Sequence, residues 1–124
     1  MAARILIVDD NKSICEMLKF FLIKEGYRVD TAEGVGAALE AIAFNEYQIM
    51  LFDKNMPGTD GNMEGGIELL RYVRSRSLPS AVIMMTGSPT VVSTAEAFKL
   101  GAADFVYKPF SLMDLSLRIK KVLQ

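Results

Sequence analysis

Short apolar runs alternate with helical patterns along the whole of this 124-residue chain. The apolar runs lie at 5–8, 27–30, 49–52, 81–85 and 104–107, and helical periodicity fills roughly 12–25, 35–45, 66–77, 90–100 and 111–123. This alternation is typical of βαβ units, whose crossover helices cover both faces of a parallel sheet. We therefore predict one α/β domain over residues 1–124, a doubly wound (βα)5 fold with strand order 2-1-3-4-5.

Residues that favour helix ends mark several of these boundaries. Gly26 and Gly101 follow the first and fourth helical patterns, where glycine readily adopts the left-handed conformation that stops a helix. Ser88-Pro89 is expected to open the fourth helix, because proline is favoured at the first helical position. Ser111, followed three residues later by Asp114, is close to a capping box and should open the fifth.

Polar side chains follow four of the predicted strands at their carboxyl ends. Asp9 and Asp10 follow the first strand, Asp53 the third, Thr86 the fourth and Lys108 the fifth. In an open parallel sheet these ends share the edge where ligands bind, so the side chains form one candidate site. Three close carboxylates repel one another unless a cation lies among them, and oxygen ligands of this kind select Mg²⁺. A carboxylate beside such a metal can attack phosphorus, while Thr86 and Lys108 would bind the phosphoryl oxygens.

Composition narrows the class of function. A net charge of −1 without a basic cluster argues against nucleic-acid binding by this segment. The absence of histidine excludes His-based catalysis and any role as a phosphohistidine donor. The single cysteine, Cys15, cannot form an internal disulfide, and the sequence shows neither a signal peptide nor an apolar run long enough for a membrane span. We therefore expect a cytoplasmic protein that makes no use of a membrane.

Four stretches of this sequence carry a resemblance to a known family. They are ILIVDDN at 5–11, LFDKNMPGTDG at 51–61, MTG at 85–87 and KPF at 108–110. In order and approximate spacing they resemble the receiver domain of two-component response regulators, over essentially the whole chain. The resemblance implies a flavodoxin-like fold and a phosphorelay role, in which Asp53 accepts a phosphoryl group from a histidine kinase or phosphotransfer protein. Such a domain regulates an output and is not an enzyme in its own right, although it assists its own phosphorylation and autodephosphorylation.

The same resemblance implies roles for individual residues. The metal ligands would be Asp10, Asp53 and the backbone carbonyl of Asn55 directly, and Asp9 through water. Thr86 and Lys108 would bind the phosphoryl group, and Lys108-Pro109 would be a cis peptide bond, which a pre-proline bond can adopt. Thr86 and Tyr107 would form the switch that alters the surface of the helix at 90–100, the strand at 104–107 and the helix at 111–123.

Helix one indicates a partner surface. Phe20 and Ile23 fall opposite its core stripe, among charged residues, which suggests docking. Since the resembling family uses this helix to meet the kinase, we interpret them as contacts with the histidine kinase or phosphotransfer protein. The other expected partners are a downstream effector domain or protein and a second copy, in a dimer that depends on phosphorylation.

Two features depart from the resembling family. A glycine-rich insertion enlarges the loop at 61–66, before the apolar helix that begins near Ile67. Lys54 places a cation directly after Asp53, where an apolar residue is more usual. The insertion should change how kinase or phosphatase surfaces approach Asp53, at little entropic cost to folding.

Three other functions fit the residues less well. An Asp-nucleophile phosphatase would carry Asp-x-Asp after strand one, but Asp9-Asp10-Asn11 stands there. A flavodoxin-like mononucleotide binder needs hydroxyls and amides in that loop, and these acids would repel its phosphate. A pseudo-receiver, an interaction module that is not phosphorylated, remains the main alternative, although the intact acids, Thr86 and Lys108 argue against it.

Phosphorylation is predicted at Asp53 alone, because only this acid follows the central strand. Incubation with acetyl phosphate and Mg²⁺ should add one phosphoryl mass to the wild type and none to Asp53→Asn, as measured by intact mass spectrometry. An acid-stable phosphoserine or phosphothreonine as the main product would contradict this assignment.

Overall fold

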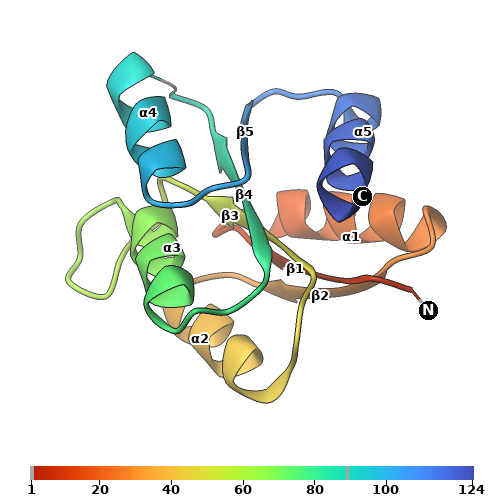
Figure 1. Ribbon diagram of the computed structural model, residues 1–124, viewed down its shortest axis with the longest axis horizontal. Coiled ribbons are helices and arrows are strands. Elements are labelled where there is room, and N and C mark those ends of the chain that lie inside the picture. The colour runs from red at the N-terminus through yellow and green to blue at the C-terminus, as the bar shows by residue number, and fades with distance from the viewer. Residues whose placement is uncertain (1, 89) are drawn as a thin grey trace.

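The computed structural model describes residues 2–88 and 90–124 and forms a five-stranded parallel sheet with helices on both faces (Figure 1). The strands are β1 (Arg4–Val8), β2 (Arg28–Ala32), β3 (Ile49–Asp53), β4 (Ala81–Thr86) and β5 (Asp104–Tyr107). The helices are α1 (Lys12–Lys24), α2 (Val35–Phe44), α3 (Gly65–Ser75), α4 (Val91–Lys99) and α5 (Leu112–Leu123). The strand order β2-β1-β3-β4-β5 confirms the predicted doubly wound fold. Within the described ranges, no helix is long and apolar enough to cross a membrane.

The sheet divides the core into two layers. Successive side chains of a strand point to opposite faces, so Ile5 and Ile7 of β1 pack on one side and Leu6 and Val8 on the other. The first layer is closed by α1 and α5, and the second by α2, α3 and α4 (Figure 1). The runs of β1, β3 and β4 are continuous because both faces of these strands are buried. The edge strand β2 is mixed instead, with Val29 and Ala32 buried and Arg28 and Thr31 exposed.

The strand register places the polar residues at one edge. Val8 of β1 pairs with Phe52 of β3, so Asp9 and Asp53 leave neighbouring strands at the same level. On the other side Asp53 pairs with Met85, the residue before Thr86. Thr86 in turn pairs with Tyr107, which precedes Lys108. Parallel pairing thus carries the acids, the hydroxyl and the ammonium to one edge.

Helix caps agree in part with the predicted boundaries. Gly26 and Gly101 have positive φ values of 100° and 105°, as expected for residues that stop α1 and α4. The Ser111 side chain accepts a hydrogen bond from the Asp114 amide at 2.9 Å and caps α5. The predicted start of α4 at Ser88-Pro89 was wrong: the cap is Thr90, which forms a capping box with Ser93, and Pro89 lies outside the described residues.

Other predicted boundaries were off by one or two residues. The second strand runs to Ala32 rather than ending at 30, because Val8 of β1 pairs with Ala32. The third helix begins at Gly65, so the last residues of the predicted 61–66 loop belong to its first turn. It ends at Ser75, before the predicted limit of 77.

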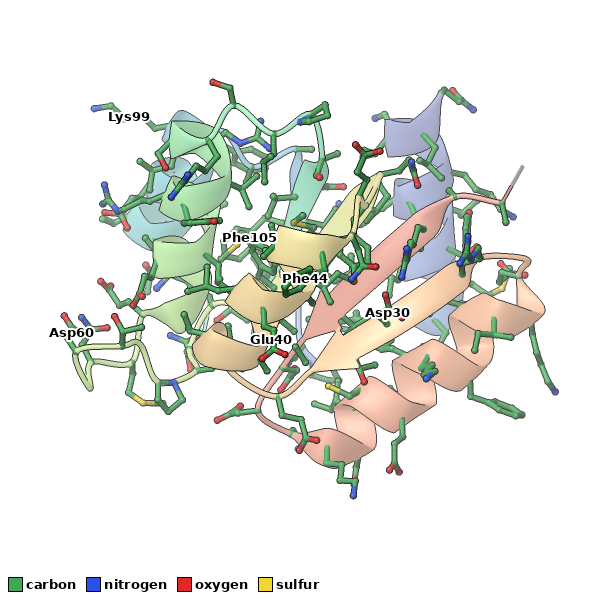
Figure 2. All side chains as sticks on the ribbon, turned by 90° about the horizontal axis from the view of Figure 1, so that it is seen from below. Asp30, Glu40, Phe44, Asp60, Lys99 and Phe105 are labelled. Carbon is green, nitrogen blue, oxygen red and sulfur yellow. The ribbon has the colours of Figure 1, made fainter. Side chains whose placement is uncertain are left out.

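The loop between β3 and α3 is closed by its own hydrogen bonds. The Gly58 amide donates to the carbonyl of Asn62 at 2.7 Å. The amide and hydroxyl of Thr59 donate to the carboxylate of Glu68, on α3, at 2.9 and 2.8 Å. Asp60 lies at its tip, away from the body of the protein (Figure 2). The insertion therefore forms a defined projection beside the end of β3.

Gly66 allows α3 to begin directly against the end of β3. A Cβ atom at Gly66 would lie 2.4 Å from the carbonyl oxygen of Asp53 and 2.6 Å from the Cα atom of Lys54. Both neighbours are backbone atoms, so they cannot move aside as a flexible side chain could. The first turn of α3 therefore packs directly against the backbone of Asp53 and Lys54.

Gly66→Ala should destabilise the protein by about 1–3 kcal/mol, because the added methyl group overpacks this contact. Gly36→Ala is the matched control, since Gly36 occupies the same position in α2 and a Cβ there meets nothing within 4 Å. That control should be neutral or stabilising by up to about 1 kcal/mol. Urea unfolding midpoints measure both, and equal effects would contradict the proposed packing role.

Candidate functional site

Three carboxylates meet at the carboxyl edge of the sheet. Asp9, Asp10 and Asp53 each offer an oxygen, and these oxygens lie within 4.8 Å of one another. Asp9 and Asp53 are buried, whereas Asp10 is exposed. The predicted convergence is confirmed, and the all-oxygen donor set suits a hard divalent cation such as Mg²⁺.

Lys108 lies among these acids, as the strand ends predicted. Its Nζ atom is 2.6 Å from Oδ2 of Asp9 and 3.5 Å from Oδ1 of Asp53. The peptide bond from Lys108 to Pro109 is cis, which confirms that expectation. The ammonium is therefore paired closely with Asp9 and more distantly with Asp53.

Asp53 is held in an unfavourable environment for a charge. Its side chain ends β3, with a residue exposure of 6%. Burial raises the pKa of the Asp53 carboxyl, the negative charge of Asp9 raises it further, and Lys108 only partly offsets these effects. A cation bound between the acids would favour the ionised form of Asp53, because a nearby positive charge lowers the pKa of a carboxyl group.

Thr86 lies at the end of β4 and is fully buried. Its hydroxyl donates a hydrogen bond to Oδ1 of Asn55 at 2.5 Å and accepts one from the Ser88 amide at 3.1 Å. Its carbonyl accepts a hydrogen bond from the Lys108 amide at 2.6 Å. Thr86 therefore contacts both the loop after Asp53 and the end of β5.

Tyr107 points outward, with an exposed fraction of 51%. Its ring packs edge to face against Phe105, with 5.7 Å between centroids. It lines a cavity of about 480 Å³ between α4 and β5, together with Thr90, Val91, Thr94, Ala95 and Phe98. The structure thus has space beside Tyr107, on the α4 side of β5.

Cys15 is a buried neighbour of the site. Its thiol donates to the carbonyl oxygen of Asp9 at 3.3 Å. Burial raises the pKa of the Cys15 thiol to about 11, with the charge of Asp9 adding to the effect. The thiol is therefore protonated at neutral pH, which agrees with the structural role expected of a buried cysteine.

The exposed apolar residues of α1 lie where the helical wheel predicted. Phe20 and Ile23 have exposed fractions of 65% and 49%. Met17, one turn before Phe20, is also exposed and borders a groove of about 430 Å³. The groove is completed by Ile14, Lys108, Pro109 and Phe110, so an apolar surface leads along α1 to the edge of the acidic cluster.

Sequence reasoning missed two features of the site. The side chain of Asn55 contacts Thr86, although the sequence suggested a role only for its backbone carbonyl. Lys54 is buried, with 7% of its surface exposed, and its amide and carbonyl bond to Met85 and Gly66. The only sequence signal for the Asn55 contact was a polar side chain two residues after Asp53. The burial of Lys54 had no sequence signal.

The fold and the site define a doubly wound α/β domain with an acidic, cation-compatible centre at its carboxyl edge. Residues 5–120 match the response regulator receiver domain. The chain is 34% identical, over 98% of its length, to the transcriptional regulatory protein ResD of Bacillus subtilis (strain 168), and it spans 48% of that protein. The chain therefore belongs to the response regulator receiver domain family.

Solved structures agree with this assignment. A CheY-like response regulator receiver domain protein from Methanospirillum hungatei JF-1 has a TM-score of 0.90 and 33% identity, with 99% of this chain and 94% of that chain covered. The beryllofluoride-activated NtrC4 receiver domain dimer has a TM-score of 0.85 and 35% identity, with 96% and 94% covered. This chain is thus a receiver domain of the two-component response regulators.

Asp53→Asn should stabilise the metal-free protein at pH 7. The pKa of Asp53 is raised in the folded state, so its favourable contribution is complete below its ordinary value of 3.8 and is lost as pH rises through the folded pKa. The neutral amide removes this penalty, and the gain should shrink as pH falls toward 4. Urea midpoints measured in a chelator across this range test the sign.

Glu40→Gln, which neutralises an exposed acid on α2 (Figure 2), is the matched control and should change stability little at any pH. A gain for Asp53→Asn that did not depend on pH would show that relief of charge is not its cause.

Proposed function

We propose that this chain is a phosphorylation-activated switch whose phosphoacceptor is Asp53. The observation that carries the proposal is the position of Asp53: buried at the end of the central strand, beside two further acids and within 3.5 Å of the Lys108 ammonium. The donor is a phosphohistidine of a histidine kinase or phosphotransfer protein. The chain has no histidine of its own to fill that role.

The chemistry is a transfer of one phosphoryl group. A carboxylate oxygen of Asp53 attacks phosphorus, the P–N bond of the donor breaks, and its electron pair returns to the donor imidazole. The product is an acyl phosphate on Asp53. Lys108 then has a second anionic partner besides Asp9 and binds a phosphoryl oxygen from its present position, since its Nζ atom already lies between the two carboxylates.

The residues present fit Mg²⁺. Asp10, Asp53 and the backbone carbonyl of Asn55 would bind it directly, and Asp9 through water. When bound, Mg²⁺ neutralises the charge between the anionic nucleophile and the anionic phosphoryl group. Burial and the charge of Asp9 raise the pKa of Asp53, and a cation at this place would favour its ionised form, which supports the assignment.

Thr86 and Tyr107 would convert phosphorylation into a change of surface. A phosphoryl oxygen offers the Thr86 hydroxyl a charge-assisted hydrogen bond, which draws the end of β4 toward the site. Tyr107 then turns into the cavity between α4 and β5. The surface of α4, β5 and α5 would control an effector domain or protein, or a second copy; the beryllofluoride-activated NtrC4 relative is described as a dimer.

The groove beside Lys108 supports a docking site for the phosphodonor. Phe20, Met17 and Ile23 form an exposed apolar surface that continues into this groove. A helical partner packed there would present its phosphohistidine at the edge of the acidic cluster. The pseudo-receiver alternative is not favoured, because it leaves the three acids and the lysine among them without a role.

Removal of Asp10 should weaken Mg²⁺ binding and phosphorylation together. Asp10→Ala deletes a direct ligand, so we expect a loss of at least about tenfold in Mg²⁺ affinity, judging from the effect of changes around metal ligands. Phosphorylation by acetyl phosphate should slow in parallel. Asp60→Ala, which removes an acid from the projecting loop, is the control. Wild-type rates for Asp10→Ala without metal would refute the proposed site.

Docking and chemistry can be separated by the size of the donor. The experiment uses a histidine kinase that phosphorylates the wild type. Phe20→Ala combined with Ile23→Ala should lower the rate of phosphotransfer from this kinase by about tenfold, which is the size of loss expected when interface anchors are truncated. The rate with acetyl phosphate should stay unchanged, because a small donor needs no docking surface. Phe44→Ala, which removes an exposed phenylalanine from α2, is the matched control. Equal losses with both donors would show that the variant damages the site instead.

A further inference from the structure

The hydroxyl proton of Thr86 is already committed in this structure. A hydroxyl has one proton to donate. The Ser88 amide donates to the Thr86 oxygen at 3.1 Å, and the Thr86 hydroxyl donates to Oδ1 of Asn55 at 2.5 Å. Thr86 is fully buried, so water does not compete for this proton. Any new acceptor at the site has to take it from Asn55.

We propose that the side chain of Asn55 is the resting-state latch of the switch: its amide oxygen holds the Thr86 hydroxyl and competes with the phosphoryl group for the same proton. This inference rests on the proposed phosphorylation of Asp53. It makes Asn55 a positioning residue with two separate parts, a backbone carbonyl for the metal and a side chain for Thr86.

The place of Asn55 in the chain links the latch to the chemistry. It follows Asp53 by two residues, and its amide donates to Oδ1 of Asp53 at 3.4 Å. Its side chain reaches across to the end of β4, to a residue 31 positions later. Asn55 therefore contacts the phosphoacceptor through its backbone and the first switch residue through its side chain.

The connection continues to the fifth strand. The carbonyl of Thr86 accepts a hydrogen bond of 2.6 Å from the backbone amide of Lys108, the residue after Tyr107. While Asn55 holds Thr86, the end of β4 is fixed in its present position, and Tyr107 lies outward. Release of the hydroxyl from Asn55 is thus the step that frees the end of β4 to move toward the site.

The strength of the latch sets how readily the switch turns. A charge-assisted hydrogen bond to a phosphoryl oxygen is about twice as strong as the neutral bond to Asn55, so phosphorylation wins the competition. The neutral bond still opposes the change. Given the usual net worth of such a bond, its removal should favour the switched state by about two- to tenfold.

The test is a double-mutant cycle read by beryllofluoride, which mimics the acyl phosphate. Wild type, Asn55→Ala, Thr86→Val and the double variant are titrated with beryllofluoride and Mg²⁺, and half-saturation is read from amide chemical shifts. Asn55→Ala also changes any direct contact with the ligand, but that effect is the same with or without the Thr86 hydroxyl. The difference between the two backgrounds therefore isolates the latch.

We expect Asn55→Ala to favour beryllofluoride binding about two- to tenfold more when the Thr86 hydroxyl is present than in the Thr86→Val background. Thr86→Ser, which keeps the hydroxyl, should restore this difference. The chemical shift of the Ser88 amide should change in Asn55→Ala without any ligand. This amide donates to the Thr86 hydroxyl, which the substitution releases from Asn55. Asn45→Ala, at the far end of α2, should change none of these measurements.

The outcomes separate the two proposals. Equal effects of Asn55→Ala in both backgrounds would overturn the latch and leave Asp53 as the phosphoacceptor. A wild type whose Asp53 amide did not respond to beryllofluoride and Mg²⁺ would overturn the proposed function, and the latch with it. If Asn55→Ala does not fold, Asn55→Leu carries the same test, because it is nearly isosteric and cannot accept a hydrogen bond.

Discussion

The ion pair between Lys108 and Asp9 holds the site together. Asp9 is fully buried and lies with two other carboxylates, an arrangement that is unfavourable without a compensating charge. The Lys108 ammonium, 99 residues later in the chain, supplies that charge at 2.6 Å. Removal of one partner of such a buried pair is strongly destabilising, because it leaves the other charge uncompensated. The strands that carry these residues, β1 and β5, are not neighbours, so the pair also ties one side of the sheet edge to the other.

Lys108 neutralises only part of the negative charge of the acidic cluster. Burial and the charge of Asp9 raise the pKa of Asp53, and Lys108, 3.5 Å away, only partly offsets them. The cluster therefore retains unbalanced negative charge at a place that a divalent cation can reach, since Asp10 is exposed. The same burial and repulsion that disfavour the charge of Asp53 make the cluster compatible with a divalent cation.

The second part of the site is uncharged. Asn55 and Thr86 join the loop after β3 to the end of β4 by one neutral hydrogen bond, and Thr86 is joined to β5 through the Lys108 amide. These bonds run across strand ends, where the ladder of the sheet no longer fixes the backbone. A neutral hydrogen bond between a loop and a strand end is well suited to a switch, because a new charge nearby can outweigh it. The close packing of Gly66 against the backbone of Asp53 leaves the start of α3 little freedom to move.

Much of the fold could be read from the sequence, because it follows from short-range patterns. Apolar runs buried on both faces, helix stops at Gly26 and Gly101, and the Ser111 cap depend on residues close in the chain. The strand ends at Asp9, Asp53, Thr86 and Lys108 followed from the same periodicity, and parallel topology brought them to one edge. The start of α4 was misplaced because Ser88-Pro89 and Thr90 offer competing caps, and local preference does not decide between them.

Sequence patterns were enough to predict which groups reach the site, but how these groups pair depends on the folded chain. Lys108 bonds to Asp9 more closely than to Asp53, and Lys108 and Asp9 are 99 positions apart in the chain. Asn55 bonds to Thr86, which is 31 positions away. The burial of Lys54 and the need for glycine at 66 likewise arise where α3 meets the end of β3. Periodicity carries no information on such distances, because they are set by the twist and register of the whole sheet and by the packing of helices upon it.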